Sequence, residues 1–534
     1  MKLKTKILKI INLIKVLNKG ELYYRFLFNV RKKSKYFERK INLNQKESKA
    51  AKIHIFNDKS IFEVSSIQYN YAGKTCDFEN YPHENSNSPW YKLNINNFSG
   101  DIREYWEFNR LQFLNIILNN YLLTNKIEHV KKINTFLNNW FKYNPLEKGW
   151  NHVSNLEIAI RSITFYRLWY YVGDKLDINL ADVLFIYGKH LFIDLPRTNR
   201  CIPNNHSLGE AVSLLLLAKM FNKKDWEKLA KKTIKKRFDL FTDNGESVEE
   251  SSGYLLFTTQ MLVFLRNLTD EFNDKLNILL PRLFYSLNLL SNKDGTLGLF
   301  GDCDDGLFYT FGSLKRNNIN QLSLEHFKNN SELNDLFNKS KTINISSSKY
   351  LIGLKNNDIK IVLIGGFELM HAHNQCLSFL MWVDEEQVVF SPGTYRYNDV
   401  SKEKRRYYNG VSRQNAPRTD SRNNLVTNFR RIKKIKKVKL TKFENKVLGE
   451  IIINKTRITR EIEIKEHEIV ITDKANEQLK PFVINVGCKI DIVQDGVNIP
   501  YIIDLYSPAY GIEKEGQYAT INPNGFNSSF SIRC

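Results

Sequence analysis

One change of pattern divides this chain of 534 residues. Between about residues 100 and 290, apolar residues recur three and four positions apart, which predicts helices separated by short polar breaks. After about residue 345 the pattern changes to alternation and β-branched runs, which predicts strands. Closely spaced strands with no helices between them favour an antiparallel sandwich. We therefore expect an α+β multidomain protein in which helices come first and sheets second.

The predicted helices have similar lengths and short connections, which suggests paired helices around a common axis. They are Glu104–Leu123, Glu128–Lys142, Asn155–Val172, Ser207–Phe221, Trp226–Phe238 and Tyr254–Leu268. The predicted strands are Tyr350–Lys355, Ile359–Gly365, Leu377–Val383, Gln387–Phe390, Val447–Ile453, Arg457–Ile464, His467–Asp473, Phe482–Val486 and Lys489–Val493. No fixed-period repeat is visible, so a solenoid is disfavoured.

Composition marks four regions along the chain. Residues 1–95 are expected to form a basic, irregular cap, and residues 96–312 the helical domain. Residues 313–345 are polar and rich in Asn, Ser and Lys, so we expect a linker there. Residues 346–534 then form the sheet domain.

The net charge of +22 favours an anionic partner, which could be nucleic acid, an anionic membrane surface or an acidic polysaccharide. No recognised nucleic-acid module is present and the charge is spread over a long chain, so we expect no nucleic-acid partner. Six cysteines without a CxxC pair fit a reducing compartment.

The start of the chain, MKLKTKILKIINLIKVLNKG, resembles a basic amphipathic helix. It is either a solvated surface helix or a peripheral membrane contact. Its longest uncharged run, Ile10–Ile14, is too short for a signal peptide or a membrane span. We expect a cytoplasmic location, with membrane association as an open alternative, rather than a periplasmic one.

Asn205 and His206 stand where a loop is predicted to enter a helix. Backbone amides and the positive helix end make such a junction favourable for an anion. An amide and an imidazole there could bind and neutralise a carboxylate. The alternative is that Asn205 is a helix cap and His206 a surface residue.

Other segments could carry chemistry. Tyr254 opens a predicted helix and is either a functional phenol or a core residue. If His371 and His373 are on a strand, they point to the same side, an arrangement that suits a metal or a catalytic base beside a structural residue. Glu157 and Arg161 are either a helix-face ion pair or, at Arg161, a clamp for a substrate carboxylate. The acidic segment Gly301–Gly306 is interpreted as a loop.

Taken in order, these segments resemble the heparinase II/III family of polysaccharide lyases and its relatives among alginate lyases and uronate epimerases. The matching pieces are Trp150…Glu157…Arg161, Asn205-His206…Glu210, Glu249-x-Ser251-x-x-Tyr254, Gly301-Asp302-x-Asp304, His371-x-His373 with Leu377-Ser378-Phe379, and Pro392-Gly393-Thr394-Tyr395. The resemblance implies an incomplete (α/α) toroid followed by an antiparallel β-sandwich.

The resemblance also implies β-elimination on an anionic glycan. Asn205 and His206 would hold the carboxylate of a uronate, and Tyr254 and His371 would act as acid and base. The residues expected to contact substrate are Arg161, Glu157, Glu250, Tyr395, Arg406 and Arg413. Two alternatives stay open: a uronyl C5-epimerase in capsule or O-antigen synthesis, and a non-catalytic glycan-binding protein on the same fold.

The chain departs from the family at the metal site that some members hold. Ser391 stands where an Asp is expected, and Gln414 stands where a His is expected. Of three expected ligands, only His373 remains. One His does not hold zinc well, so we predict no metal and no cofactor.

Overall fold

The computed structural model describes residues 19–44, 49–56, 69–76, 87–310, 333–356, 358–366, 371–398, 400–423, 435–453, 455–466, 468–487 and 490–533. The chain forms two compact units. Unit 1 comprises Met1–Ile67, Asp77–Asp239 and Phe308–Ser313. Unit 2 comprises Gln68–Cys76, Leu240–Leu307 and Leu314–Cys534. Two long helices, Ser252–Leu268 and Asn273–Leu289, therefore belong to the unit that holds the sheets. The domain boundaries expected from the sequence stay a prediction.

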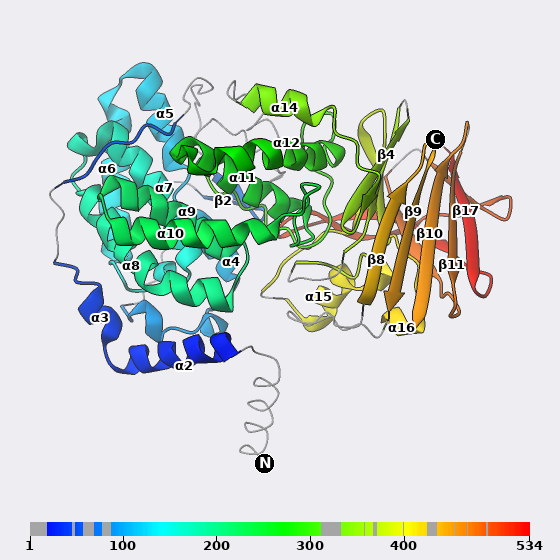
Figure 1. The fold of residues 1–534 in the computed structure, drawn as a ribbon, viewed down its shortest axis with the longest axis horizontal. Coiled ribbons are helices and arrows are strands. Elements are labelled where there is room, and N and C mark those ends of the chain that lie inside the picture. Colours follow the sequence, from blue (N-terminus) through cyan, green and yellow to red (C-terminus); the bar gives the residue numbers. More distant parts are fainter. Residues whose placement is uncertain are drawn as a thin grey trace, which may run out of the picture. The chain divides into compact units, whose positions relative to one another are not determined.

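Unit 1 is built from helices. They are α2 (Lys19–Lys33), α3 (Tyr36–Lys40), α4 (Ile102–Asn109), α5 (Leu114–Thr124), α6 (Ile127–Tyr143), α7 (Asn155–Val172), α8 (Leu180–Cys201), α9 (Asn205–Met220) and α10 (Lys224–Arg237) (Figure 1). Successive helices pack on one another: α5 on α6, α7 on α8, α8 on α9 and α9 on α10. Contacts of α7 with both α5 and α9 join these pairs into one array.

Inner and outer helices of unit 1 differ in how their apolar residues are spread. Helices α7 and α9 are buried on almost every side, and only His206 and Lys219 of α9 keep some exposure. Helix α10 buries one stripe at helical spacing, which includes Trp226, Ala230 and Ile234. A helix that is buried on almost every side must be enclosed by other helices, whereas a helix with one apolar stripe packs that stripe inward and exposes its other face to solvent. This alternation is the layering expected for paired helices.

One predicted helix is broken in the structure, and two helices were not predicted. The predicted helix Glu104–Leu123 is broken into α4 and α5, and Leu111 in the break has a φ of 58°. Sequence pattern missed α8 and also α12 (Asn273–Leu289), which belongs to unit 2. Each has an interior proline, Pro196 and Pro281 respectively. Proline usually argues against a helix interior, but burial of the surrounding apolar residues overrides that preference.

Unit 2 contains α11 (Ser252–Leu268), α12 and α14 (Asn334–Ser340), with α12 packed on both other helices. A small antiparallel hairpin pairs β1 (Tyr69–Tyr71) with β2 (Lys74–Cys76). Short helices α15 (Lys402–Asn409) and α16 (Asp420–Asn423) interrupt the strands. Residues 313–332 of the predicted linker lie outside the described residues, and α14 occupies much of the rest.

Two antiparallel sheets dominate the described part of unit 2 (Figure 1). One has eight strands in the order β14-β13-β17-β11-β10-β9-β8-β3, and the other seven in the order β15-β16-β12-β7-β6-β5-β4. The strands are β3 (Ser347–Ser348), β4 (Leu351–Asn356), β5 (Ile359–Ile364), β6 (Phe379–Val383), β7 (Glu386–Val389), β8 (Ile435–Lys442), β9 (Lys446–Ile453), β10 (Thr456–Ile464), β11 (Ile469–Ala475), β12 (Phe482–Val486), β13 (Asp491–Gln494), β14 (Val497–Asn498), β15 (Ile502–Ala509), β16 (Ile512–Ile521) and β17 (Asn527–Arg533).

The core of unit 2 lies between the sheets. Its buried cluster takes Ile451 and Ile462 from the larger sheet and Met381 and Ile484 from the smaller one. Along β10 the buried positions alternate with partly exposed ones, as the side chains of a half-buried strand must. These helices followed by antiparallel sheets confirm the predicted fold class.

Two expectations fall partly or wholly outside the described ranges. The basic start of the chain is described only from residue 19. The basic stretch Arg430–Lys439, for which the sequence allows a solvated edge strand or a track for a polyanion, is described only from Ile435, where β8 begins. None of the helices in the described ranges combines the length and apolar character that crossing a bilayer requires.

Candidate active site

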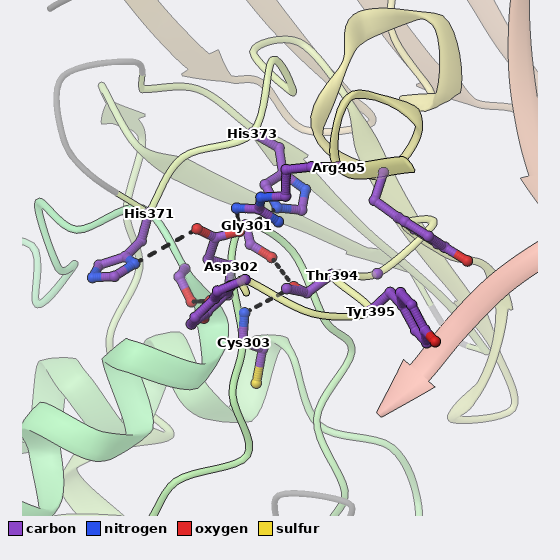
Figure 2. A network of polar contacts seen from close by, with 12 residues as sticks. Gly301, Asp302, Cys303, His371, His373, Thr394, Tyr395 and Arg405 are labelled. Carbon is purple, nitrogen blue, oxygen red and sulfur yellow. Dashed lines mark hydrogen bonds and ion pairs between the residues drawn. The ribbon is translucent and has the colours of Figure 1, made fainter. Parts of the chain in front are cut away.

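A buried loop of unit 2 brings Asp302 among side chains from several other segments. Gly301 before it has a φ of +68°, and a Cβ atom there would lie 2.3 Å from the carbonyl oxygen of Glu250, so only glycine fits. The amide of Asp302 donates to the carbonyl of His371 at 2.7 Å. The amide of Cys303 donates to Oγ1 of Thr394 at 2.9 Å (Figure 2). These bonds fix the direction of the Asp302 carboxylate.

His371, His373 and Arg405 gather around that carboxylate (Figure 2). His373 Nε2 lies 2.8 Å from Oδ1, and His371 Nδ1 lies 3.8 Å from Oδ2. Arg405, from α15, donates through Nη2 to Oδ1. Burial of Asp302 favours the neutral acid, but the Arg405 guanidinium and the two histidines hold its pKa well below the usual range. The group is therefore an anion that orients its neighbours.

Tyr254 and His371 stack face to face. Their ring centroids are 3.7 Å apart and their planes differ by 17°. Tyr254 is the third residue of α11, and its amide donates to the N-cap side chain of Ser251. Its hydroxyl donates to Oδ2 of Asp304 at 3.2 Å and accepts from the hydroxyl of Tyr397 at 3.5 Å. A phenol and an imidazole thus lie side by side in one polar network.

The residues around Asp302 do not fit a bound metal. The Arg405 guanidinium donates to the same carboxylate oxygen that His373 contacts, so a cation already balances this charge. Within the described ranges, no group of three or more His, Cys, Asp or Glu side chains is arranged to hold a metal ion. Arg405 provides in the chain itself the positive charge that a metal would bring.

Asn205 and His206 begin α9 in unit 1. Asn205 is fully buried and His206 is partly exposed. The helix is capped by Asn204, whose side chain accepts from the His206 amide at 3.1 Å, so the alternative that Asn205 is the cap is wrong. Because these two residues belong to unit 1 and the Tyr254–His371 pair to unit 2, their meeting around one sugar stays a prediction.

Glu157 and Arg161 are both fully buried in unit 1, but they do not pair with each other. Glu157 accepts from Arg110 at 2.8 and 3.0 Å. Arg161 donates to the carbonyls of Asn109 and Asn151 and to the Tyr187 hydroxyl. These contacts hold helices together and argue against direct contact of either side chain with substrate. Their expected role in substrate binding is untested.

The other expected substrate contacts lie in unit 2. Glu250 is buried, with a φ of 56°. The ring of Tyr395 stacks on Tyr408, and the Lys404 ammonium lies 4.4 Å from its centroid.

Two arginines complete that expected set, and their surroundings differ. Arg406 on α15 is exposed and can meet an anion directly. Arg413 lies between Tyr407 and Tyr518 and forms an ion pair with Asp504 at 3.1 Å. Arg413 therefore already has a carboxylate partner.

Sequence reasoning missed the roles of Asp302 and Arg405. The segment Gly301-Asp302-x-Asp304 contributes to the family resemblance and is predicted to be a loop, but the sequence assigns Asp302 no role, and Arg405 directly precedes the expected substrate contact Arg406. The density of acids between two glycines was the available signal. A buried carboxylate in such a turn needs a cation, but Arg405 lies 103 positions further along the chain, so the sequence does not show that the two meet.

Comparisons with known proteins agree with this fold. Residues 361–478 match a family model described as heparinase II/III-like, C-terminal, which confirms the resemblance inferred from the motifs. The crystal structure of heparinase III has a TM-score of 0.62 and 12% identity, covering 97% of this chain and 92% of that chain. A heparinase III gene product has a TM-score of 0.56 and 15% identity over the same shares. The comparison with curated proteins gives no match. At these identities the likeness concerns the fold, which this chain shares with heparinase III.

Proposed function

We propose that the chain is a polysaccharide lyase that acts on an anionic glycan. It removes the C5 proton of a uronic acid unit and eliminates the sugar linked at O4. One observation carries the proposal: Tyr254 and His371 stack at 3.7 Å beside the buried Asp302 carboxylate. This arrangement offers an acid and a base in contact, and the fold shared with heparinase III supports the same class of reaction.

His371 is the proposed base. Its Nδ1 faces Asp302 at 3.8 Å, which favours the tautomer that carries a proton on Nδ1. Nε2 then keeps a lone pair for the C5 proton of the substrate. Asp302 also stabilises the imidazolium that results, because the carboxylate stays ionised.

Tyr254 is the proposed acid. When the C5 proton moves to His371, the C5–H electron pair first passes to the substrate carboxylate as an enediolate. It then forms the C4–C5 double bond while the C4–O4 bond breaks and the departing oxygen takes the proton of the Tyr254 hydroxyl. The His371 imidazolium then releases its proton to solvent, and the Tyr254 phenolate recovers one from solvent. Each such transfer typically contributes about 10²- to 10⁴-fold to the rate.

The substrate carboxylate must be neutralised for C5 to lose its proton. Asn205 and His206 are the proposed donors to that carboxylate, which would stabilise the enediolate-like intermediate. Exposed Arg406 is a further proposed contact for the polyanion. The partner in this proposal is therefore an acidic polysaccharide.

The stacking favours elimination over C5 epimerisation. An epimerase removes a proton from one face of C5 and returns it to the other, so its two groups must stand on opposite sides of the sugar. Rings that touch at 3.7 Å and 17° approach a sugar from the same side. We therefore expect a syn elimination, on a uronate whose C5 hydrogen and C4 oxygen share one face of the ring.

The test is an assay on a panel of acidic glycans in deuterated solvent. The ultraviolet absorbance of the unsaturated uronate reports elimination, and deuterium at C5 of uncleaved polymer reports epimerisation. Tyr254→Phe is expected to lower turnover by about 10²-fold or more, with glycan binding retained. Tyr506→Phe, in the same unit but outside the cluster, is the matched control. Deuterium at C5 without cleavage would mean that the protein is an epimerase and not a lyase. Glycan binding without either product would mean that it is a non-catalytic glycan-binding protein.

The two histidines separate the proposed roles. His371→Ala is expected to cost more activity than His373→Ala, because His373 is fully buried and bonded to Asp302, whereas His371 is the proposed base for the sugar. Equal losses together with zinc in the purified protein would overturn the metal-free arrangement.

A further inference from the structure

Unit 1 has a pocket of about 490 Å³ at the start of α7 and α9. Helix α2, which packs on α8, supplies part of its wall through Arg25, Phe28 and Lys32. Pockets of this size accommodate a small ligand such as one or two sugar units. His206, a proposed donor to the substrate carboxylate, is among its lining residues, whereas Tyr254 and His371 are not.

One side of the pocket is aromatic. Phe28 of α2, Trp90 and Tyr91 line it, and they belong to one packed cluster around Phe37. The Trp90 indole is fixed by a bond of 2.8 Å to Glu147. Rigid aromatic surfaces suit the apolar face of a sugar ring, because that face has no hydroxyl groups to desolvate.

The other side of the pocket is polar, and some of its groups are not satisfied. Arg25 Nε, Ser154 Oγ and Glu210 Oε1 are buried atoms without a hydrogen-bond partner in the described part of the chain. The second oxygen of Glu210 accepts from the side-chain amide of Asn155 at 3.3 Å. Buried polar atoms left unpaired are costly, so a pocket lined by them is suited to a polar ligand.

The charges around the pocket favour an anion. Arg25, Lys32 and Arg197 line it, and Arg197 forms an ion pair with Asp194. Burial and the nearby Asp194 raise the pKa of Glu210 to about 8. At neutral pH Glu210 is therefore mostly a neutral acid whose O–H can donate. Arg25, Ser154 and Glu210 then form a set of three donors, which matches the acceptor oxygens of a carboxylate.

We propose that this pocket binds one acidic sugar unit, with its carboxylate at Arg25, Ser154 and Glu210 and its ring against the aromatic side. The identity of the ligand as a uronate rests on the proposed function. Binding itself does not depend on Tyr254 or His371, because every lining residue belongs to unit 1.

The test uses the full chain carrying Tyr254→Phe, so that no turnover interferes. Methyl β-D-glucuronide is titrated against methyl β-D-glucoside, a neutral sugar of the same shape, by calorimetry and by tryptophan fluorescence. The glucuronide is expected to bind at least about ten-fold more tightly. Arg25→Gln is expected to remove at least about ten-fold of this affinity, whereas Lys33→Gln, an exposed change on the same helix, leaves it within about two-fold.

Ser154→Ala provides a second, milder test in case Arg25→Gln disturbs α2, with thermal melting as the check on folding. The proposal that this pocket binds an acidic sugar would be wrong if the two sugars bound with equal affinity, or if Arg25→Gln and Ser154→Ala each kept full affinity. The two proposals fail separately. Glucuronide binding without an unsaturated product from any glycan would contradict only the proposed lyase activity. Product formation without glucuronide binding would contradict only the proposed sugar pocket.

Discussion

At the scale of single residues, Asp302 organises the candidate active site. One carboxylate contacts the proposed base, a second imidazole and a guanidinium, and almost none of it reaches solvent. The cation comes from a residue 103 positions along the chain. Sequence motifs predicted Tyr254 and His371 as a pair, but they could not predict Asp302 and Arg405, because only the fold brings those segments together.

Arg405→Met tests whether the guanidinium positions this site. The substitution leaves a buried carboxylate without its cation, so we expect the protein to lose about 3 kcal/mol of stability. Turnover should fall by about 10²-fold, because the Asp302 carboxylate that faces His371 loses the guanidinium that holds it ionised and in place. Thermal melting and the elimination assay measure both effects.

Lys402→Met, an exposed change on the same helix, is the control for Arg405→Met. Arg405→Lys should recover part of the activity, since the charge returns without the planar geometry of the guanidinium. Wild-type melting and turnover in Arg405→Met would show that the ion pair is incidental.

Glu210 gives a prediction about pH. Burial and Asp194 raise its pKa from the ordinary 4.5 to about 8. Between these values the folded state keeps a proton that the unfolded chain has released, so its contribution to stability declines as the pH rises. Relative to Glu210→Gln, the wild-type free energy of unfolding should fall by about 1.4 kcal/mol per pH unit in that window. Denaturant melts of both proteins at several pH values measure the difference, and parallel curves would contradict it.

At the scale of elements, sequence predicted best where pattern and burial agree. The bounds of α7 were predicted as found, since its apolar run begins after Ser154 and ends before Gly173. Strands β15 to β17 were missed. The exposed apolar residues Ile502, Ile503 and Leu505 of β15 break the usual alternation. The sequence left open whether His371 and His373 are on a strand, and they lie in irregular chain before β6.

Helix α2 has two different faces. Arg25, Phe28 and Lys32 line the pocket of unit 1, whereas Tyr23, Phe26 and Val30 are exposed. Exposed aromatic residues on a helix with a basic last turn are typical of a segment that lies on an anionic bilayer. We propose that α2 contributes to a peripheral membrane contact.

Vesicle binding tests this contact. A double change, Tyr23→Ser with Phe26→Ser, should weaken binding to phosphatidylglycerol-containing vesicles by about five-fold or more. Ile278→Ser removes an exposed apolar residue of α12 and should have no effect. Cosedimentation measures both, with phosphatidylcholine vesicles as the neutral comparison. If all three proteins bind alike, α2 is not the contact.

At the scale of the whole molecule, the order of helices before sheets was predictable because the two periodicities separate so cleanly along the chain. The division into compact units was not. Residues Leu240–Leu307, which include α11 and α12, pack with the sheets although their pattern is helical. Periodicity identifies an element, whereas its packing partner depends on contacts that are distant in sequence.

The charge of +22 leads to a prediction about salt. Raising sodium chloride from about 50 to about 500 mM should weaken binding of an acidic polysaccharide by at least about ten-fold. Binding measured on the Tyr254→Phe protein avoids cleavage. A neutral polysaccharide is the comparison, and a salt-independent affinity for the acidic polymer would rule out electrostatic attraction as its source.

The two faces of α2 have a mechanical consequence. Because one face of α2 lines the pocket, a partner that binds the other face also restrains the pocket wall. Whatever docks over Tyr23 and Phe26 would therefore stiffen the frame that holds Arg25 and Phe28. Membrane attachment and sugar binding would then be coupled through helix α2.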